Sequence, residues 1–178
     1  MNRLHKILMA LTLLGAAAMT GSCRITLSFT EANIPVAATT FSVAYFPNNS
    51  PMVSPMLSNT LTEAIIDRFT RQTRLDQASE SGDLAIEGEI TGYMTAPSAI
   101  TADSQFEGAA MNRLTITVQV RFVNVLEPEW NFPPGGKSFT AYADYPGTAM
   151  LQDVAAGLEE EIVTTLVDQI FNATVANW

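Results

Sequence analysis

The sequence has 178 residues, of which 47% are hydrophobic, and its nine basic and eighteen acidic residues give a formal net charge of −9 at pH 7. Such an acidic chain is a poor partner for nucleic acid, whose phosphates attract basic surfaces. The one histidine, His5, and the one cysteine, Cys23, both lie near the N-terminus. The remainder of the chain therefore has no Ser-His or Cys-His catalytic pair, and no zinc site built from these ligands.

Residues 1–22 have the layout of a secretory signal peptide. Two basic residues precede an apolar stretch over residues 7–19, and the small residues Gly21 and Ser22 follow it. The apolar stretch is shorter than the roughly 20 residues that span a bilayer. Cys23 comes directly afterwards, which predicts a lipoprotein whose thiol carries lipid. An ordinary signal with a chance cysteine is the alternative, since Thr20 stands where lipoprotein signals usually carry Leu.

The next segments predict a tether, a strand and a helix. Residues 23–38 form the lipidated tether, and residues 39–178 form a single domain. Residues 39–46 are rich in β-branched and aromatic side chains and end at a Pro-Asn-Asn turn, which indicates the first strand. Ser54-Pro55 is a good start for a helix. Its apolar face repeats every four residues, at Leu57, Leu61, Ile65 and Phe69.

Two further strands alternate in polarity. In the first, we expect one face to carry Leu84, Ile86, Ile90 and Met94. The same strand contains Gly88 and Gly92, which we expect to mark bulges or close backbone contacts. In the second, over residues 113–125, apolar and polar residues alternate regularly from Arg113 to Phe122. A symmetric hairpin would place Glu87 opposite Arg121.

A connection of about 15 residues, 96–110, joins these strands, and loops this long are usually functional or disordered. It contains Pro97, Asp103, Gln105, Phe106 and Glu107.

The last two elements are a strand over residues 137–145 and a helix over about 150–173. In the strand, Phe139 and Ala141 are expected on one face and Tyr142 and Asp144 on the other. In the helix, apolar residues form a row, and residues 159–161 are expected at the solvated surface. The fold class is therefore α+β. It is a two-layer α/β sandwich in which a four-stranded sheet carries two helices on one face, in the order β-α-β-β-β-α.

No cluster of residues indicates catalysis, a metal or a cofactor. Glu87 and Glu89 share a face, with Asp83 further along it, and three carboxylates could bind calcium. Their spacing is not that of an EF-hand loop, however, and a solvated face explains them better. The remaining candidates are the cations Arg113, Arg121 and Lys137. Alternation places Arg113 and Arg121 on the same solvated face, and Lys137 opens the neighbouring strand. In an acidic protein they could form a patch that binds phosphates, or they could balance nearby carboxylates.

Several segments resemble, in the same order, the lipopolysaccharide-assembly lipoprotein family LptE in the form found in Bacteroidetes-type bacteria. They are Val43-Ala44-Tyr45-Phe46-Pro47-Asn48, Gly88-Glu89-Ile90-Thr91-Gly92-Tyr93, Asn112-Arg113-Leu114-Thr115-Ile116-Thr117-Val118, Ala143-Asp144-Tyr145, Phe171-Asn172 and Ala176-Asn177-Trp178.

This resemblance implies a non-enzymatic lipoprotein on the periplasmic side of the outer membrane. Such a protein assembles and plugs the LptD-type β-barrel translocon and aids lipopolysaccharide transport. Arg113, Arg121 and Lys137 are then candidate lipopolysaccharide-phosphate contacts, and the loop over residues 96–110 is a candidate to reach into the barrel lumen. The alternative is a periplasmic-facing lipid- or glycan-binding lipoprotein without a barrel partner.

Overall fold

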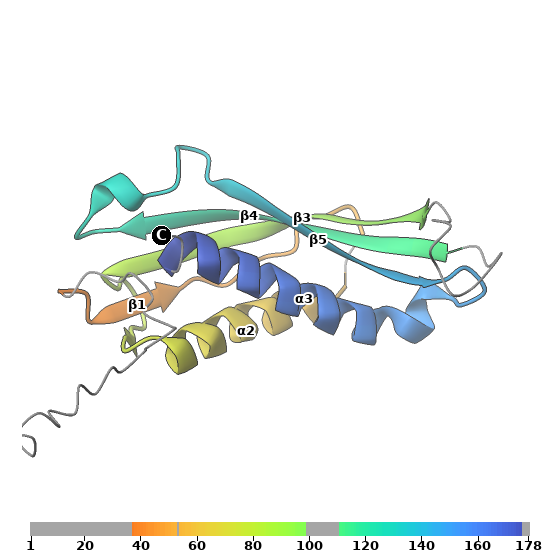
Figure 1. Cartoon of the computed structure of the whole chain (residues 1–178), viewed down its shortest axis with the longest axis horizontal. Coiled ribbons are helices and arrows are strands. Elements are labelled where there is room, and N and C mark those ends of the chain that lie inside the picture. Colours follow the sequence, from red (N-terminus) through yellow and green to blue (C-terminus); the bar gives the residue numbers. More distant parts are fainter. Residues whose placement is uncertain (1–36, 53, 99–110, 176–178) are drawn as a thin grey trace, which may run out of the picture.

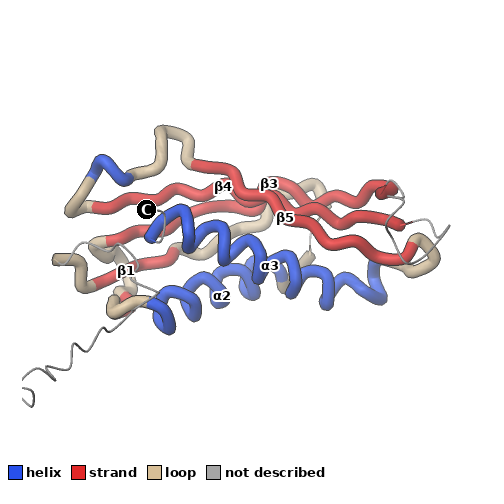
Figure 2. Tube along the Cα trace, in the orientation of Figure 1, coloured by secondary structure: helices blue, strands red, loops and turns tan. Residues whose placement is uncertain are grey.

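The computed structural model describes residues 37–52, 54–98 and 111–175, and the predicted signal peptide, Cys23 and most of the tether lie outside them. The strands form one sheet in the order β2-β1-β3-β4-β5, and both helices lie on the same face of it (Figure 1). Figure 2 shows the same two layers. The elements, in chain order, are β1 (Thr40–Val43), α2 (Leu57–Gln72), β2 (Asp76–Gln77), β3 (Leu84–Ser98), β4 (Met111–Asn124), the 3₁₀ helix η2 (Pro128–Trp130), β5 (Lys137–Pro146) and α3 (Leu151–Val175).

The predicted class and the placement of the helices are confirmed, but the predicted number of strands and the predicted order β-α-β-β-β-α are wrong, because a further strand, β2, follows α2. The sheet has five strands, because β2 pairs in parallel with β1 at its edge. This strand consists of only two exposed polar residues, Asp76 and Gln77. It has no apolar alternation from which a strand could be predicted. β1 also pairs in parallel with β3, as a β-α-β unit requires.

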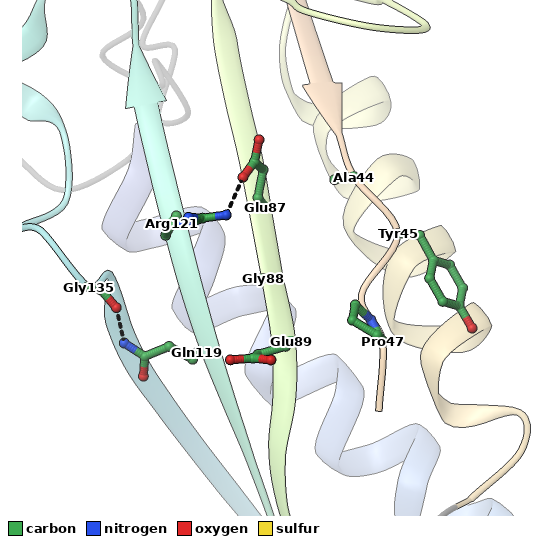
Figure 3. Close-up of a pocket in the computed structure, with 9 residues that line it drawn as sticks. All are labelled: Ala44, Tyr45, Pro47, Glu87, Gly88, Glu89, Gln119, Arg121 and Gly135. Carbon is green, nitrogen blue, oxygen red and sulfur yellow. Dashed lines mark hydrogen bonds and ion pairs between the residues drawn. The ribbon is translucent and has the colours of Figure 1, made fainter. Parts of the chain in front are cut away.

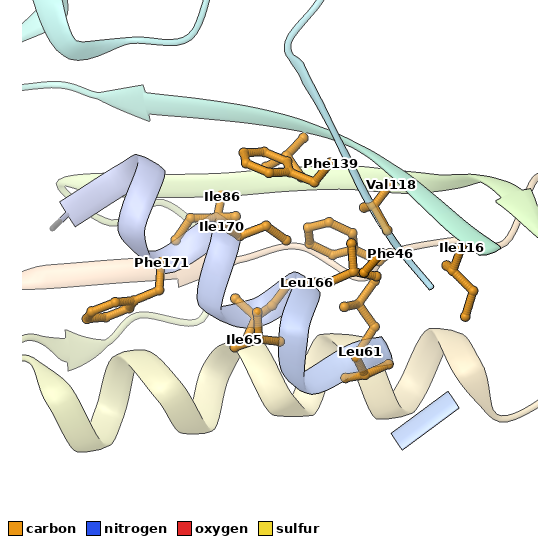
Figure 4. Close-up of a cluster of buried hydrophobic side chains, with 14 of the residues drawn as sticks. Phe46, Leu61, Ile65, Ile86, Ile116, Val118, Phe139, Leu166, Ile170 and Phe171 are labelled. Carbon is orange, nitrogen blue, oxygen red and sulfur yellow. The ribbon is translucent and has the colours of Figure 1, made fainter. Parts of the chain in front are cut away.

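The core lies between the helices and the sheet. The α2 row Leu57, Leu61, Ile65 and Phe69 is at most 1% exposed, so the four-residue repeat correctly predicted the buried face. Ile116 and Val118 of β4 meet Leu166 and Ile170 of α3 in the same cluster (Figure 4). Full burial of a side chain of this size contributes about 1.5–3 kcal/mol to folding.

A β-bulge in β3 overturns the prediction for Met94. The register with β4 shifts between Ile90 and Gly92, which inserts Thr91 as an extra residue. Beyond it the alternation is reversed, so Tyr93 is buried in the core and Met94 is exposed. The predicted close backbone contact at Gly88 is confirmed, because a Cβ at this position would lie closer than 3.0 Å to the Gln119 carbonyl oxygen.

Several predicted boundaries also move. β1 ends at Val43 instead of residue 46, although Ala44 N–H still donates to the Ile86 carbonyl at 2.9 Å. α2 begins at Leu57, and the hydroxyl of Ser54, the predicted cap, instead donates to Glu159 at 3.0 Å. Capping was predicted from local sequence alone, whereas this bond joins residues 105 positions apart.

The predicted connection over residues 96–110 begins later than expected. β3 continues to Ser98, and Pro97 pairs with Asn112 of β4. A proline is tolerated there because β1 pairs only with the start of β3, so that Pro97 borders no second strand. The other residues named for this loop, Asp103, Gln105, Phe106 and Glu107, lie outside the described residues.

Candidate functional site

The sheet face opposite α2 and α3, here called the open face, carries most of the candidate residues. Side chains that alternate with the buried ones point to it, as in antiparallel sheets with one solvated face. It includes Glu87, Glu89, Arg113, Thr115, Thr117, Gln119, Arg121, Thr140, Tyr142 and Asp144. The prediction that Arg113 and Arg121 share one face is confirmed.

Arg113 is engaged by its own neighbours. Its Nε and Nη2 donate to the two carboxylate oxygens of Asp144, on the adjacent strand, at 2.7 and 2.8 Å. The guanidinium carbon also lies 3.7 Å from the ring centre of Tyr142. Hydrogen bonding to Arg113 lowers the pKa of Asp144. A bidentate pair stacked on an aromatic ring holds the guanidinium firmly, so an external phosphate would have to displace these contacts.

Arg121 is more available. It lies opposite Glu87, as predicted, and its Nη2 donates to Glu87 Oε2 at 2.7 Å. Its side chain remains 66% exposed. A guanidinium has five N–H donors, and the described residues engage one nitrogen of Arg121. The other donors remain free for an anion.

Arg121 lines a surface pocket of about 470 Å³ between β3, β4 and the segment that follows β1 (Figure 3). Gln119 donates to the Gly135 carbonyl at 2.6 Å, which fixes one wall. Gly135 and Gly136 have φ values of 97° and 81°, which favour glycine and allow the Pro-Pro-Gly-Gly turn to approach β4 closely. The lining residues are Ala44, Tyr45, Pro47, Glu87, Gly88, Glu89, Gln119, Arg121 and Gly135.

The pocket offers both hydrogen-bond donors and acceptors. Arg121 and Gln119 provide N–H groups, and Glu87 and Glu89 provide carboxylate oxygens. Tyr45 and Pro47, of the segment that follows β1, line the other side of the pocket (Figure 3). This mixture suits a polar group, such as a sugar or a phosphate, better than an acyl chain.

Lys137 does not join the two arginines. It pairs in register with Val120, whose side chain is buried in the core, and so it points to the helix side of the sheet. Its Nζ lies 5.6 and 5.4 Å from the ring centres of Phe132 and Phe139. Arg113 and Arg121 are eight residues apart on β4, which is about 26 Å at roughly 3.3 Å per residue. The three cations therefore form no common patch.

The carboxylates considered for a metal have other partners. Asp83 Oδ2 accepts hydrogen bonds from the backbone N–H groups of Thr39 and Thr40 at 2.8 and 3.0 Å, and these bonds lower the pKa of Asp83. Glu87 pairs with Arg121, and Glu89 accepts a hydrogen bond from Asn49. Within residues 37–52, 54–98 and 111–175, no three His, Cys, Asp or Glu residues are arranged to hold a metal ion.

The comparison with known families decides which family this is. A family model described as "LptE: Lipopolysaccharide-assembly" matches residues 38–174. The chain belongs to this family. The resemblance inferred from the sequence is thus confirmed for LptE, whereas the Bacteroidetes form stays a prediction. None of the curated proteins matches the sequence.

Solved structures similar to this LptE-family chain include three distant ones. A minor lipoprotein from Acinetobacter baumannii is 13% identical, with a TM-score of 0.46 over 79% of this chain and 94% of that one. A hypothetical protein from Chlamydia trachomatis is 10% identical, with a TM-score of 0.48 over 79% and 100%. A protein from Xanthomonas campestris is 13% identical, with a TM-score of 0.48 over 80% and 86%.

Neither of the long helices described here has the length and apolarity that a bilayer crossing requires.

Sequence reasoning missed one buried polar group. Glu159 was expected at the solvated surface of the last helix, but it is only 9% exposed. The missed signal is its spacing, because Glu159 lies four residues before Val163 and eight before Val167, in a row that is buried. Three consecutive glutamates suggested a charged surface and outweighed that position.

Proposed function

We propose that this LptE-family chain is a non-enzymatic lipoprotein, anchored through Cys23 at the periplasmic side of the outer membrane, that assembles and plugs an LptD-type β-barrel translocon. In that position it aids the transport of lipopolysaccharide to the cell surface. The observation that carries this proposal is the family match over residues 38–174. The signal layout before Cys23 supports the anchor.

The open face supports a role inside a barrel. Barrel lumens of outer-membrane proteins are polar, and a plug needs a surface that can form hydrogen bonds with such walls. The open face presents threonines, glutamine, carboxylates and guanidinium groups along three strands. Its polarity is suited to that contact. The segment over residues 96–110 remains our candidate to reach into the lumen.

Arg121 is our first candidate for a lipopolysaccharide phosphate, because its side chain is exposed and most of its donors are free. Lys137 is a separate candidate on the other face of the sheet, where its ammonium group lies near aromatic rings. Arg113 is the weakest of the three, since Asp144 and Tyr142 already hold it.

A lipid- or glycan-binding lipoprotein without a barrel partner is the second candidate, and the polar pocket beside Arg121 favours it. A lipid site in the middle of the core, between α2 and the sheet, has less support, because Leu61, Ile65 and Ile116 pack there and have no exposed surface.

The test of the barrel partner is affinity purification of the tagged full-length protein from detergent-solubilised outer membranes, with mass spectrometry of the partners. We expect a large β-barrel protein in stoichiometric amount. Recovery of the protein without a barrel would reject the plug and favour the second candidate.

The phosphate contact has a well-matched control. Arg121→Ala should weaken lipopolysaccharide binding by the purified protein about tenfold, which corresponds to about 1.4 kcal/mol. Arg71 of α2 is also an exposed arginine paired with one carboxylate, Asp67, at 2.7 Å, but it lies on a helix away from the open face. Arg71→Ala should leave binding unchanged. Equal losses in both variants would indicate a general charge effect and contradict a contact at Arg121.

A further inference from the structure

A buried carboxylate on the helix side of the sheet has only neutral hydrogen-bond donors. Glu159 Oε1 accepts from the Tyr93 hydroxyl at 2.9 Å, and Oε2 accepts from the Ser54 hydroxyl at 3.0 Å. Burial and the bond to Glu159 raise the pKa of Tyr93, which keeps its phenol protonated and donating. Glu159 is not a member of the ion pairs Arg68–Asp168, Arg71–Asp67, Arg113–Asp144 and Arg121–Glu87. Buried carboxylates in proteins are usually paired with a cation.

Glu159 also lines a pocket of about 720 Å³, within the usual range for binding sites. The pocket lies where the segment before α2, the distal half of β3 and the start of α3 meet. The described residues that line it are mostly apolar, and none of them is a lysine or arginine. The lining residues are Met52, Ser54, Pro55, Tyr93, Met150, Leu151, Gln152, Ala155 and Glu159.

The carboxylate retains hydrogen-bonding capacity. An ionised carboxylate has about four acceptor sites, and the two hydroxyls occupy two of them. Apolar walls strengthen any ion pair formed beside them, because the local dielectric constant is low. A group that enters this pocket should therefore carry a positive charge on an apolar stem. Anionic groups, including phosphates, are disfavoured by the like charge of Glu159.

The rim of the pocket indicates a protein as the source of that group. Met52 and Met150 are 45% and 70% exposed, and Met56, next to Pro55, is 64% exposed. Methionines are flexible and polarizable, and they are frequent at surfaces that adapt to a partner. The aliphatic stem of a lysine or arginine can pack against such side chains while its charged end reaches a carboxylate.

We propose that this pocket receives a basic side chain of a partner protein, with its stem against Met52 and Met150 and its charged end on Glu159. The site lies on the opposite side of the sheet from the open face. The inference needs a protein partner, but it does not require that the partner be a β-barrel or that the open face bind lipopolysaccharide.

The first test uses n-butylammonium, which reproduces the lysine side chain, and the purified full-length protein in detergent with ¹³C-labelled methionine methyl groups. Titration should shift the NMR signals of Met52 and Met150 and leave Met94, on the open face, unchanged. Butyrate and butanol, which share the alkyl chain, should bind at least tenfold more weakly. Equal binding of all three would overturn the proposal, because it would show an apolar pocket without charge selection.

The second test asks whether the cation belongs to a protein. A photo-crosslinking amino acid in place of Met150, in cells, should give a protein-sized adduct, and Glu159→Gln in the same chain should reduce that adduct at least tenfold. The butylammonium titration of the unsubstituted protein stands even if Glu159→Gln fails to fold. If butylammonium binds but no protein adduct forms at position 150, the proposal of a protein partner is rejected, and a small amine is the ligand that the pocket accepts.

Discussion

Two glycines in this fold should respond oppositely to the same substitution. Gly88 lies in β3, where a Cβ would lie closer than 3.0 Å to the backbone carbonyl oxygen of Gln119 and to the ring of buried Phe46. The carbonyl cannot move without distorting the pairing of β3 with β4. Gly157 lies within α3, where an added Cβ meets no atom within 4 Å. Gly88→Ala and Gly157→Ala therefore add the same methyl group to a closed and an open position.

The magnitudes follow from these surroundings. Overpacking of a core site costs about 1–3 kcal/mol. For a protein of this size, about 1 kcal/mol corresponds to roughly 2–4 °C in Tm, so Gly88→Ala should lower Tm by about 2–12 °C. Alanine is about 0.8–1 kcal/mol more favourable than glycine inside a helix, so Gly157→Ala should raise Tm by about 2–4 °C.

Thermal unfolding of both variants and the parent protein, followed by far-UV circular dichroism, measures these shifts. The reasoning fails if Gly88→Ala is as stable as the parent, because β3 would then have room that its register with β4 does not provide. A loss in Gly157→Ala would show that α3 packs against something at that position.

Two further predictions concern charged groups. A double-mutant cycle on Glu87 and Arg121, measured by urea denaturation, should give a coupling of about 0–1 kcal/mol, since both side chains are exposed; more than about 2 kcal/mol would contradict this. Hydrogen bonds from Thr39 and Thr40 lower the pKa of Asp83 in the folded protein. The ionised Asp83 therefore stabilises the fold at pH values above the unfolded-state pKa of an aspartate, which is about 3.9, and this contribution is lost as the pH falls further. Asp83→Asn should flatten the loss of stability below about pH 4, and an unchanged pH profile would refute it.

The elements that the sequence predicted well are those in which local pattern and tertiary packing agree. The four-residue repeat of α2 and the two-residue alternation of β4 each place apolar side chains on one face, and burial of that face gives the fold much of its stability. The pairing of Glu87 with Arg121 followed from the hairpin alone. The buried faces needed only the period of each element, and the pairing needed in addition a hairpin that is symmetric about its loop.

The errors occur where a long-range contact overrides the local pattern. The bulge at Thr91 reverses the alternation of β3, and a single sequence does not mark its position beyond the nearby Gly92. β2 exists only because β1 offers an edge to Asp76 and Gln77. Lys137 is a different kind of error, because the alternation that places Phe139 and Ala141 on the buried face places Lys137 on that face as well. The pairing of Lys137 with Val120 agrees with this alternation, which was not applied when Lys137 was grouped with the arginines.

Glu159 is the most informative of these errors, because its position contradicts its residue type. A leucine there would continue the buried row of Val163 and Val167, whereas the glutamate requires hydroxyls from two distant segments to satisfy its oxygens. Violations of the hydrophobic pattern that the rest of a fold compensates are typical of functional positions. Because Arg121 and Glu159 lie on opposite sides of the sheet, substitutions at the two sites should add without coupling. The open face and the pocket can therefore be tested as separate binding surfaces of one protein.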